Sequence, residues 1–134
     1  MQEQYQTGNI ELMIPADRSM MMVVRLTTAG VLARSPIGVD KLDDAKMAVE
    51  EACNYLVEQM HSRGRILLRF CMDEDGLSVV VRDAGPCGEQ CGGTADSGET
   101  EIVRFMLEAL ADEVEMDVCG DWIREIRMRL HLGE

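Results

Sequence analysis

The sequence has little positive charge for its size. Thirteen Lys and Arg residues stand against 25 Asp and Glu residues, and the formal net charge is −12. Duplex nucleic acids are bound mainly through Lys and Arg side chains that neutralise phosphates, and an anionic membrane surface repels a chain of this charge. We therefore expect neither nucleic acid nor membrane as a partner, whereas a basic protein surface would be attracted.

Long apolar runs and the common catalytic motifs are also absent. No stretch approaches the length of a transmembrane helix, and no charged leader precedes a long apolar segment. We therefore expect a cytoplasmic protein. The sequence has no Gly-x-Ser-x-Gly elbow, no phosphate-binding P-loop and no His-Glu-x-x-His pair, so the usual signatures of serine hydrolases, P-loop enzymes and zinc proteases are missing.

The cysteine pattern is not that of a secreted protein. Five cysteines are present, and most lie in apolar segments, as is typical of thiols in a reducing compartment. We expect no disulfide bond. Cys87 and Cys91 form one Cys-x3-Cys pair, which falls short of the two pairs of a structural zinc site. No metal site is predicted, and a redox switch through these two thiols is kept as an alternative.

The remaining composition is that of a globular domain. At 134 residues the chain is long enough for one domain with a single core, and we expect that domain to span residues 1–134. Aromatic residues are scarce, with one Trp, two Tyr and two Phe, whereas Met occurs 11 times. Flexible thioethers should therefore supply much of the packing.

Hydrophobic periodicity predicts the order of the elements. Residues 1–8 are polar and expected to be frayed, and residues 84–98 lose all periodicity and should form a long loop. Between them we predict an edge strand over 10–14, a helix capped by Asp17 or Ser19 that ends near 34, a helix over 42–60 capped by Asp40, a hairpin over 65–72 and 77–81, a helix over 99–111, and strands near 114–118 and 126–132.

This order predicts an α+β fold. Strands that pair as hairpins and helices that follow one another favour a two-layer sandwich, with a mixed, mostly antiparallel sheet of about five strands and three helices on one face. In the helix over 42–60, the apolar residues fall on one stripe that should face the sheet: Leu42, Val49, Ala52, Cys53, Leu56 and Met60.

Four segments in this order resemble the anti-sigma-factor serine kinases, small bacterial members of the GHKL superfamily of ATPases. They are the opening at 15–34, Glu-Ala-Cys at 51–53, the turn at 81–85 and Leu-Ala-Asp-Glu-Val-Glu at 110–115. The resemblance covers nearly the whole chain. It implies a histidine-kinase/HSP90-like ATPase fold, ATP and Mg²⁺ as cofactors, transcription regulation through a sigma factor and an anti-anti-sigma-factor-like protein, and a homodimer.

The resemblance also assigns roles to individual residues. Glu51 takes the place of the catalytic base, and Tyr55 takes the place of the asparagine that holds magnesium. Asp83 and Gly85 stand in the adenine-binding turn, with Gly88 as its further glycine. A one-residue slip would use Glu50 and Asn54 instead of the first pair, but it would turn the helix by about 100° and move its apolar stripe off the sheet.

Two departures from the family pattern bear on activity. A phenol is a poor ligand for Mg²⁺, which prefers hard oxygen ligands. The two phosphate-binding glycines of the family fall on Glu101 and Val103, whose side chains keep a triphosphate away from the backbone. We therefore predict a family regulator with weakened or lost kinase activity. The alternative is a nucleotide-independent protein-interaction module on the same fold.

Overall fold

A computed structural model describes residues 9–34, 39–61, 63–85, 97–120 and 122–131, without the side chains of 39, 40 and 97–99. In chain order the elements are β1 (Ile10–Pro15), a short 3-10 helix (Arg18–Met20), α1 (Met21–Leu32), α2 (Val39–Met60), β2 (Arg65–Met72), β3 (Gly76–Asp83), α3 (Ser97–Glu108), β4 (Glu113–Cys119) and β5 (Trp122–His131).

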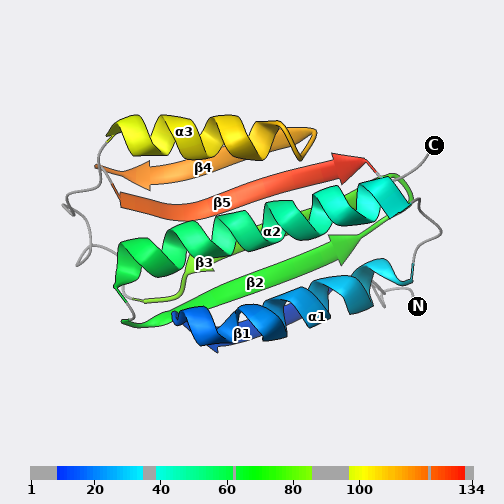
Figure 1. The fold of residues 1–134 in the computed structure, drawn as a ribbon, viewed down its shortest axis with the longest axis horizontal. Coiled ribbons are helices and arrows are strands. Elements are labelled where there is room, and N and C mark those ends of the chain that lie inside the picture. The colour runs from blue at the N-terminus through cyan, green and yellow to red at the C-terminus, as the bar shows by residue number, and fades with distance from the viewer. Residues whose placement is uncertain (1–8, 35–38, 62, 86–96, 121, 132–134) are drawn as a thin grey trace, which may run out of the picture.

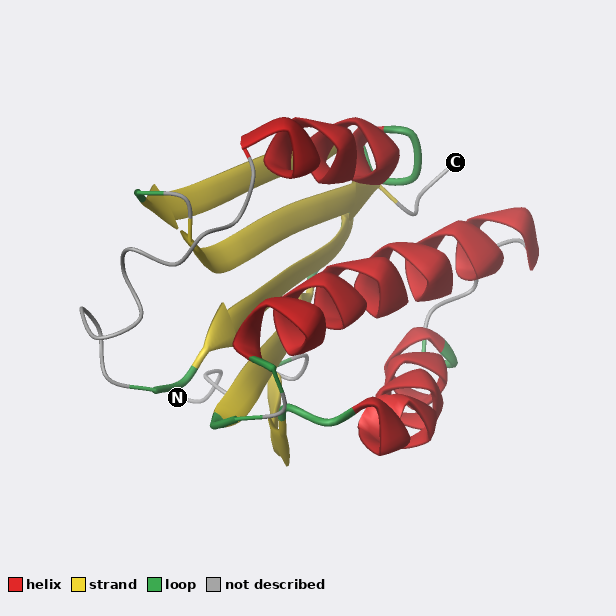
Figure 2. Ribbon diagram, turned by 60° about the vertical axis from the view of Figure 1, so that its left-hand side comes forward, coloured by secondary structure: helices red, strands yellow, loops and turns green. Residues whose placement is uncertain are grey.

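The fold is the predicted two-layer α+β sandwich. The strand order is β1-β2-β3-β5-β4, with β1 at one edge, and all pairings among these strands are antiparallel, so the sheet is not mixed. The three helices lie over one face of the sheet, with α2 between α1 and α3 (Figure 1), and a rotated view shows the two layers (Figure 2). None of the described helices is long and apolar enough to span a membrane.

The core lies between α2 and the sheet. Alternation along β2 buries Ile66, Leu68 and Phe70, and the matching stripe of α2 is fully buried at Val49, Ala52 and Leu56. The predicted rotation of α2 is therefore confirmed, and a helix turned by one residue would expose this stripe.

Several predicted boundaries need correction. The helical backbone of α2 begins at Val39, so Asp40 lies in its first turn and is not the residue before the helix. The helix α3 begins at Ser97, two residues before the predicted start at 99, so the predicted loop over 84–98 is shorter at its C-terminal end. The helix ends at Glu108 and not at the predicted residue 111. Residues 1–8 and 86–96 lie outside the described residues.

The expectation of no disulfide bond is wrong for one residue. Cys119, the last residue of β4, is disulfide-bonded, and its partner is not among the described residues. Cys53 and Cys71 are free. Position in an apolar segment is therefore a poor guide to the state of Cys119.

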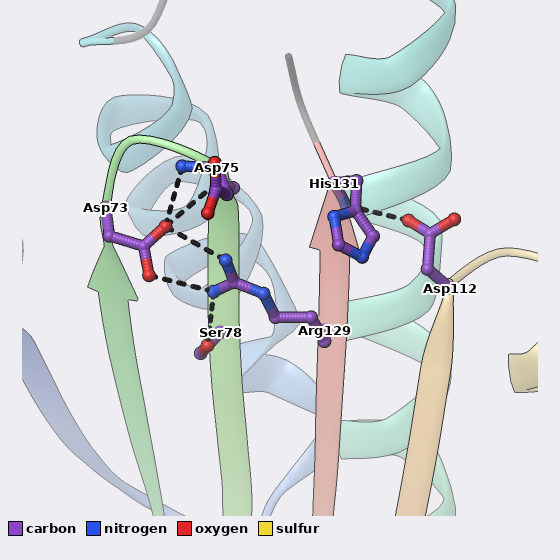
Figure 3. Close-up of polar contacts among 7 residues, drawn as sticks. Asp73, Asp75, Ser78, Asp112, Arg129 and His131 are labelled. Atoms are coloured by element: carbon purple, nitrogen blue, oxygen red, sulfur yellow. Dashed lines mark hydrogen bonds and ion pairs between the residues drawn. The ribbon is translucent and has the colours of Figure 1, made fainter.

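Two aspartates fasten the ends of the strands (Figure 3). Asp112 donates its backbone N–H to the carbonyl oxygen of Arg129 at 2.9 Å, and its carboxylate accepts the backbone N–H of His131 at 2.7 Å. These contacts hold the start of β4 against β5. In the β2–β3 turn, the Oδ1 atom of Asp73 accepts the backbone N–H groups of Asp75 and Gly76 at 2.9 and 3.0 Å.

We expect Asp73→Asn to lower stability at neutral pH by less than about 1 kcal/mol, the usual worth of an exposed ion pair. The Asp73 carboxylate also meets Arg129 at 2.9 and 3.2 Å, and the hydrogen bond from Arg129 is the main reason why the pKa of Asp73 is lowered from 3.8. A carboxyl group whose pKa is lower in the folded than in the unfolded protein stabilises the fold at pH values above its unfolded-state pKa. This contribution disappears as the pH falls through its folded-state pKa.

Urea unfolding over a series of pH values tests this prediction. The difference between wild type and Asp73→Asn should close as the pH falls below 3.8. Asp44→Asn, at an exposed position on α2, is the control and should change little. A difference that is independent of pH would contradict the ion-pair account.

Candidate functional site

The outward side of α2 forms the floor of a pocket between the three helices. The pocket has a volume of about 430 Å³ and lies beside the C-terminal half of α2. The 3-10 helix supplies Arg18, α1 supplies Met21 and Arg25, and α3 supplies Val103, Met106 and Leu107. The α2 residues are Glu50, Glu51, Asn54, Tyr55 and Glu58.

Both arginines of this pocket are paired with glutamates of α2. Arg18 donates to Glu58 at 2.7 Å, and the Nε of Arg25 donates to both carboxylate oxygens of Glu50 at 3.2 and 3.3 Å. The hydrogen bond and charge of Glu50 raise the pKa of Arg25, which therefore stays protonated. Among the described residues, Glu51 has no such partner, and it lies between the two pairs along the helix.

The pocket contains both pairs of residues that the sequence offered as alternatives. Glu51 and Tyr55 line it as predicted, but so do Glu50 and Asn54. Neighbouring helical residues point about 100° apart, and the pocket is wide enough to reach both. Sequence reasoning missed Arg18, Arg25 and Glu58, because nothing in the sequence indicates that the start of α1 lies against the end of α2.

Cys53 lies one residue before Asn54 but on the buried side of the helix. Burial raises the pKa of the Cys53 thiol to about 12, and the negative charge of Glu50 contributes to this increase. Because the thiolate is the reactive form, Cys53 is an inert packing residue at neutral pH.

A second pocket, of about 460 Å³, lies at the ends of α2 and β3. The predicted residues Asp83 and Gly85 line it, together with Gln59, Met60, His61, Arg63, Gly64 and Trp122. The structure therefore separates the predicted site residues, because no residue is common to the two linings. Gly88 lies outside the described residues.

The carboxylate of Asp83 already has two protein partners. Its Oδ1 atom accepts the backbone N–H of Gly85 at 2.8 Å, and its Oδ2 atom accepts the indole N–H of Trp122 at 3.2 Å. Trp122 is the first residue of β5, which therefore begins before the predicted strand near 126–132. The contact between its indole and this aspartate was not predictable from local sequence patterns, since the two residues are 39 positions apart.

Gln59 fixes the wall behind this second pocket. Its amide Nε2 donates to the carbonyl oxygen of Ile123 at 2.8 Å, and its Oε1 accepts the backbone N–H of the same residue at 2.9 Å. The side chain is buried. It therefore pairs α2 with the start of β5, and so holds Trp122 next to Asp83.

Glu101 and Val103 lie inside α3 and not at its start. Only the first four N–H groups of a helix lack an intrahelical partner, and in α3 these belong to residues 97–100. Glu101 is exposed, and Val103 lines the first pocket and packs on the core.

Comparison with known proteins agrees with this architecture. Residues 14–130 match the family model of the histidine kinase-like ATPase domain. The serine-protein kinase RsbW of Bacillus velezensis is 32% identical over 122 residues, which is 80% of this chain and 76% of the relative. The RsbW protein of Halalkalibacterium halodurans is 30% identical over 125 residues, which is 84% of this chain and 77% of that protein.

The fold also matches a solved structure. The crystal structure of the RsbU and RsbW domains of a Mycobacterium tuberculosis protein superposes with a TM-score of 0.70 at 18% identity. The match covers 94% of this chain but only 33% of the longer one. At this identity the comparison supports the fold alone.

Proposed function

Since this chain belongs to the family of histidine kinase-like ATPase domains, with RsbW serine-protein kinases among its relatives, we propose that it is an anti-sigma-factor regulator whose kinase activity is weakened or lost. It acts by binding a sigma factor and an anti-anti-sigma-factor-like protein. A single domain over residues 1–134, a homodimer and a cytoplasmic location belong to the same proposal.

The position of residues 101 and 103 inside α3 is the observation that carries the weakened-kinase part of the proposal. The backbone N–H groups of residues 101 and 103 are used within the helix, and the exposed carboxylate of Glu101 would repel a phosphate. In the first pocket Tyr55, at the family's magnesium position, offers only a phenol, where a hard ligand such as an amide oxygen is preferred. The amide of Asn54 also lines this pocket, but Glu50, the carboxylate one turn before it, is already paired with Arg25. The described residues thus fit a magnesium triphosphate poorly.

The proposed roles of the individual residues follow the family pattern. Glu51 is the catalytic base of any remaining activity, since its carboxylate lines the first pocket without an ion-pair partner among the described residues. Tyr55, Asp83, Gly85 and Gly88 are the proposed nucleotide contacts. ATP supplies the phosphoryl group in active relatives of this type, and we derive no phosphoryl-transfer step for the present chain.

The second candidate is a protein-interaction module that needs no nucleotide. It is favoured by the contacts of Asp83, because both carboxylate oxygens accept hydrogen bonds from Trp122 and Gly85. An adenine amino group would have to share these oxygens with donors that the fold already provides.

Calorimetric titration with ATP and Mg²⁺ tests the proposal. We expect half-saturation above about 1 mM, which is the upper end of common enzyme KM values, and the same weak response from Asp83→Asn. The control is Asp117→Asn, at an exposed position on β4. Micromolar binding that is lost only in Asp83→Asn would show a working nucleotide site and contradict the weakened-kinase part.

Capture of candidate partners tests the regulatory part. Immobilised protein should retain its sigma factor or the antagonist without added nucleotide. Mass spectrometry identifies the retained proteins, and sigma factors of other groups serve as the negative control. Capture that requires ATP and Mg²⁺ would instead support an active kinase, and a protein that retains neither class of partner would contradict the regulator.

A further inference from the structure

The helix α3 leaves an apolar stripe exposed. Phe105 is 75% exposed, Ile102 is 60% exposed and Met106 is 42% exposed, and Ala109 is exposed as well. Their spacing of three and four residues places them on one side of the helix. The opposite side is the one that packs on the core, through the fully buried Leu107 and the partly buried Val103 and Leu110.

This stripe reaches the first pocket at one residue, and the other two helices expose further apolar side chains. Met106 belongs both to the stripe and to the pocket lining. Across α2, which lies between the other two helices (Figure 1), α1 exposes Leu26 to 65% and also Met22, and α2 itself exposes Met47. Exposed thioethers adapt to the shape of a partner, so the helix layer offers a surface for an apolar ligand segment.

The charges beside the stripe select the kind of partner. Glu101 and Glu108 are exposed and lie seven residues apart, along the side of α3 next to Phe105, with the half-buried Arg104 between them, so this side carries a net negative charge. A second copy of this chain would place the same carboxylates opposite one another in a two-fold contact, which is unfavourable at a net charge of −12. A segment with Lys or Arg beside its apolar residues is complementary to both features.

We propose that the stripe on α3 is the docking surface for a basic amphipathic helix of a partner protein. The apolar residues of that helix cover Phe105 and Ile102, and its Lys or Arg side chains pair with Glu101 and Glu108. This inference rests on the proposed function only in that a regulator needs a protein partner. It adds where that partner binds and what chemistry it presents.

A synthetic 18-residue peptide serves as the probe, with Leu at helical spacing and Lys at the flanking positions. The matched peptide has Glu in place of Lys. We expect the Lys peptide to bind, with backbone NMR shifts centred on α3, and the Glu peptide not to bind. Phe105→Ser should weaken binding on the order of tenfold, as for an interface anchor, whereas Met13→Ser should not, since Met13 is 48% exposed on β1, on the face of the sheet without helices.

Charge variants separate docking from general attraction. The double variant Glu101→Gln with Glu108→Gln should weaken binding and reduce its salt dependence. The control carries Glu74→Gln and Glu113→Gln, which remove the same charge at exposed positions outside the helices. Equal weakening by the two double variants would overturn the proposal, because binding would then follow net charge alone.

Three further outcomes also decide the matter. Concentration-dependent dimers in sedimentation that Phe105→Ser abolishes would assign the stripe to a second copy and overturn the proposal. If the sigma factor or antagonist is captured equally well by Phe105→Ser, the proposed function stands and the docking surface fails. Peptide docking on α3 without capture of either protein would support the surface while the proposed function fails.

Discussion

Gln59→Leu is expected to lower the free energy of unfolding by roughly 3 kcal/mol, the sum of two unsatisfied buried groups. Gln59 is buried and exchanges both of its amide hydrogen bonds with the backbone of Ile123. Leucine has a similar size, so the loss comes from the stranded N–H and carbonyl of Ile123 and not from a cavity. For a domain of this length we expect the melting temperature to fall by about 10 °C.

The neighbouring position provides the control. Glu58→Leu removes an exposed ion pair with Arg18 and should cost less than about 1 kcal/mol. Thermal and urea unfolding followed by circular dichroism measure both changes. Trp122, the only tryptophan, should also change its fluorescence in the native Gln59→Leu protein, since it precedes Ile123, the residue that Gln59 holds, at the start of β5. Equal stability losses in the two variants would contradict the role of the amide pair.

Those parts of the fold that depend on local periodicity were predictable. Ile66, Leu68 and Phe70 alternate along one strand, and Val49, Ala52 and Leu56 repeat at helical spacing, and both sets are fully buried. Each pattern has one period and one apolar face, so it fixes both the element and its orientation.

The orientation of α3 was not predictable in the same way. Its apolar residues occupy two sides of the helix, one with Leu107 and Val103 and the other with Ile102, Phe105 and Met106. A helix that is apolar on two sides has no single preferred rotation. Packing on α2 and the sheet decides between the sides, and the stripe over Phe105 and Met106, which stands at helical spacing in the sequence, is the exposed one.

The polar contacts of the candidate site depend on pairs of residues that are distant in sequence. Arg25 meets Glu50, and Trp122 meets Asp83, across 25 and 39 positions. Gln59 did leave a signal, because it lies three residues after Leu56 and seven after Ala52, on the buried stripe of α2. A polar residue in such a place needs a buried partner, although the sequence cannot say which one.

Gly76→Ala should destabilise the protein by roughly 3 kcal/mol, at the upper end of overpacking costs. Gly76 begins β3 and pairs with His131 on β5. An added Cβ would lie 2.0 Å from the backbone carbonyl oxygen of Leu130, and 3.0 Å from two further backbone atoms of Leu130 and His131. A flexible side chain could move away from such a contact, but the backbone of β5 cannot move as freely, because β5 pairs with both β3 and β4.

Gly30→Ala is the matched substitution with the opposite expected sign. Gly30 lies in α1 with nothing within 4 Å of an added Cβ, and its φ is not positive. Alanine in a helix interior is about 1 kcal/mol more favourable than glycine, so this variant should be the more stable protein. Urea unfolding measures both changes. If the two variants shifted stability in the same direction, the close approach of β3 and β5 at Gly76 would not be the cause, because both changes add the same methyl group to the chain.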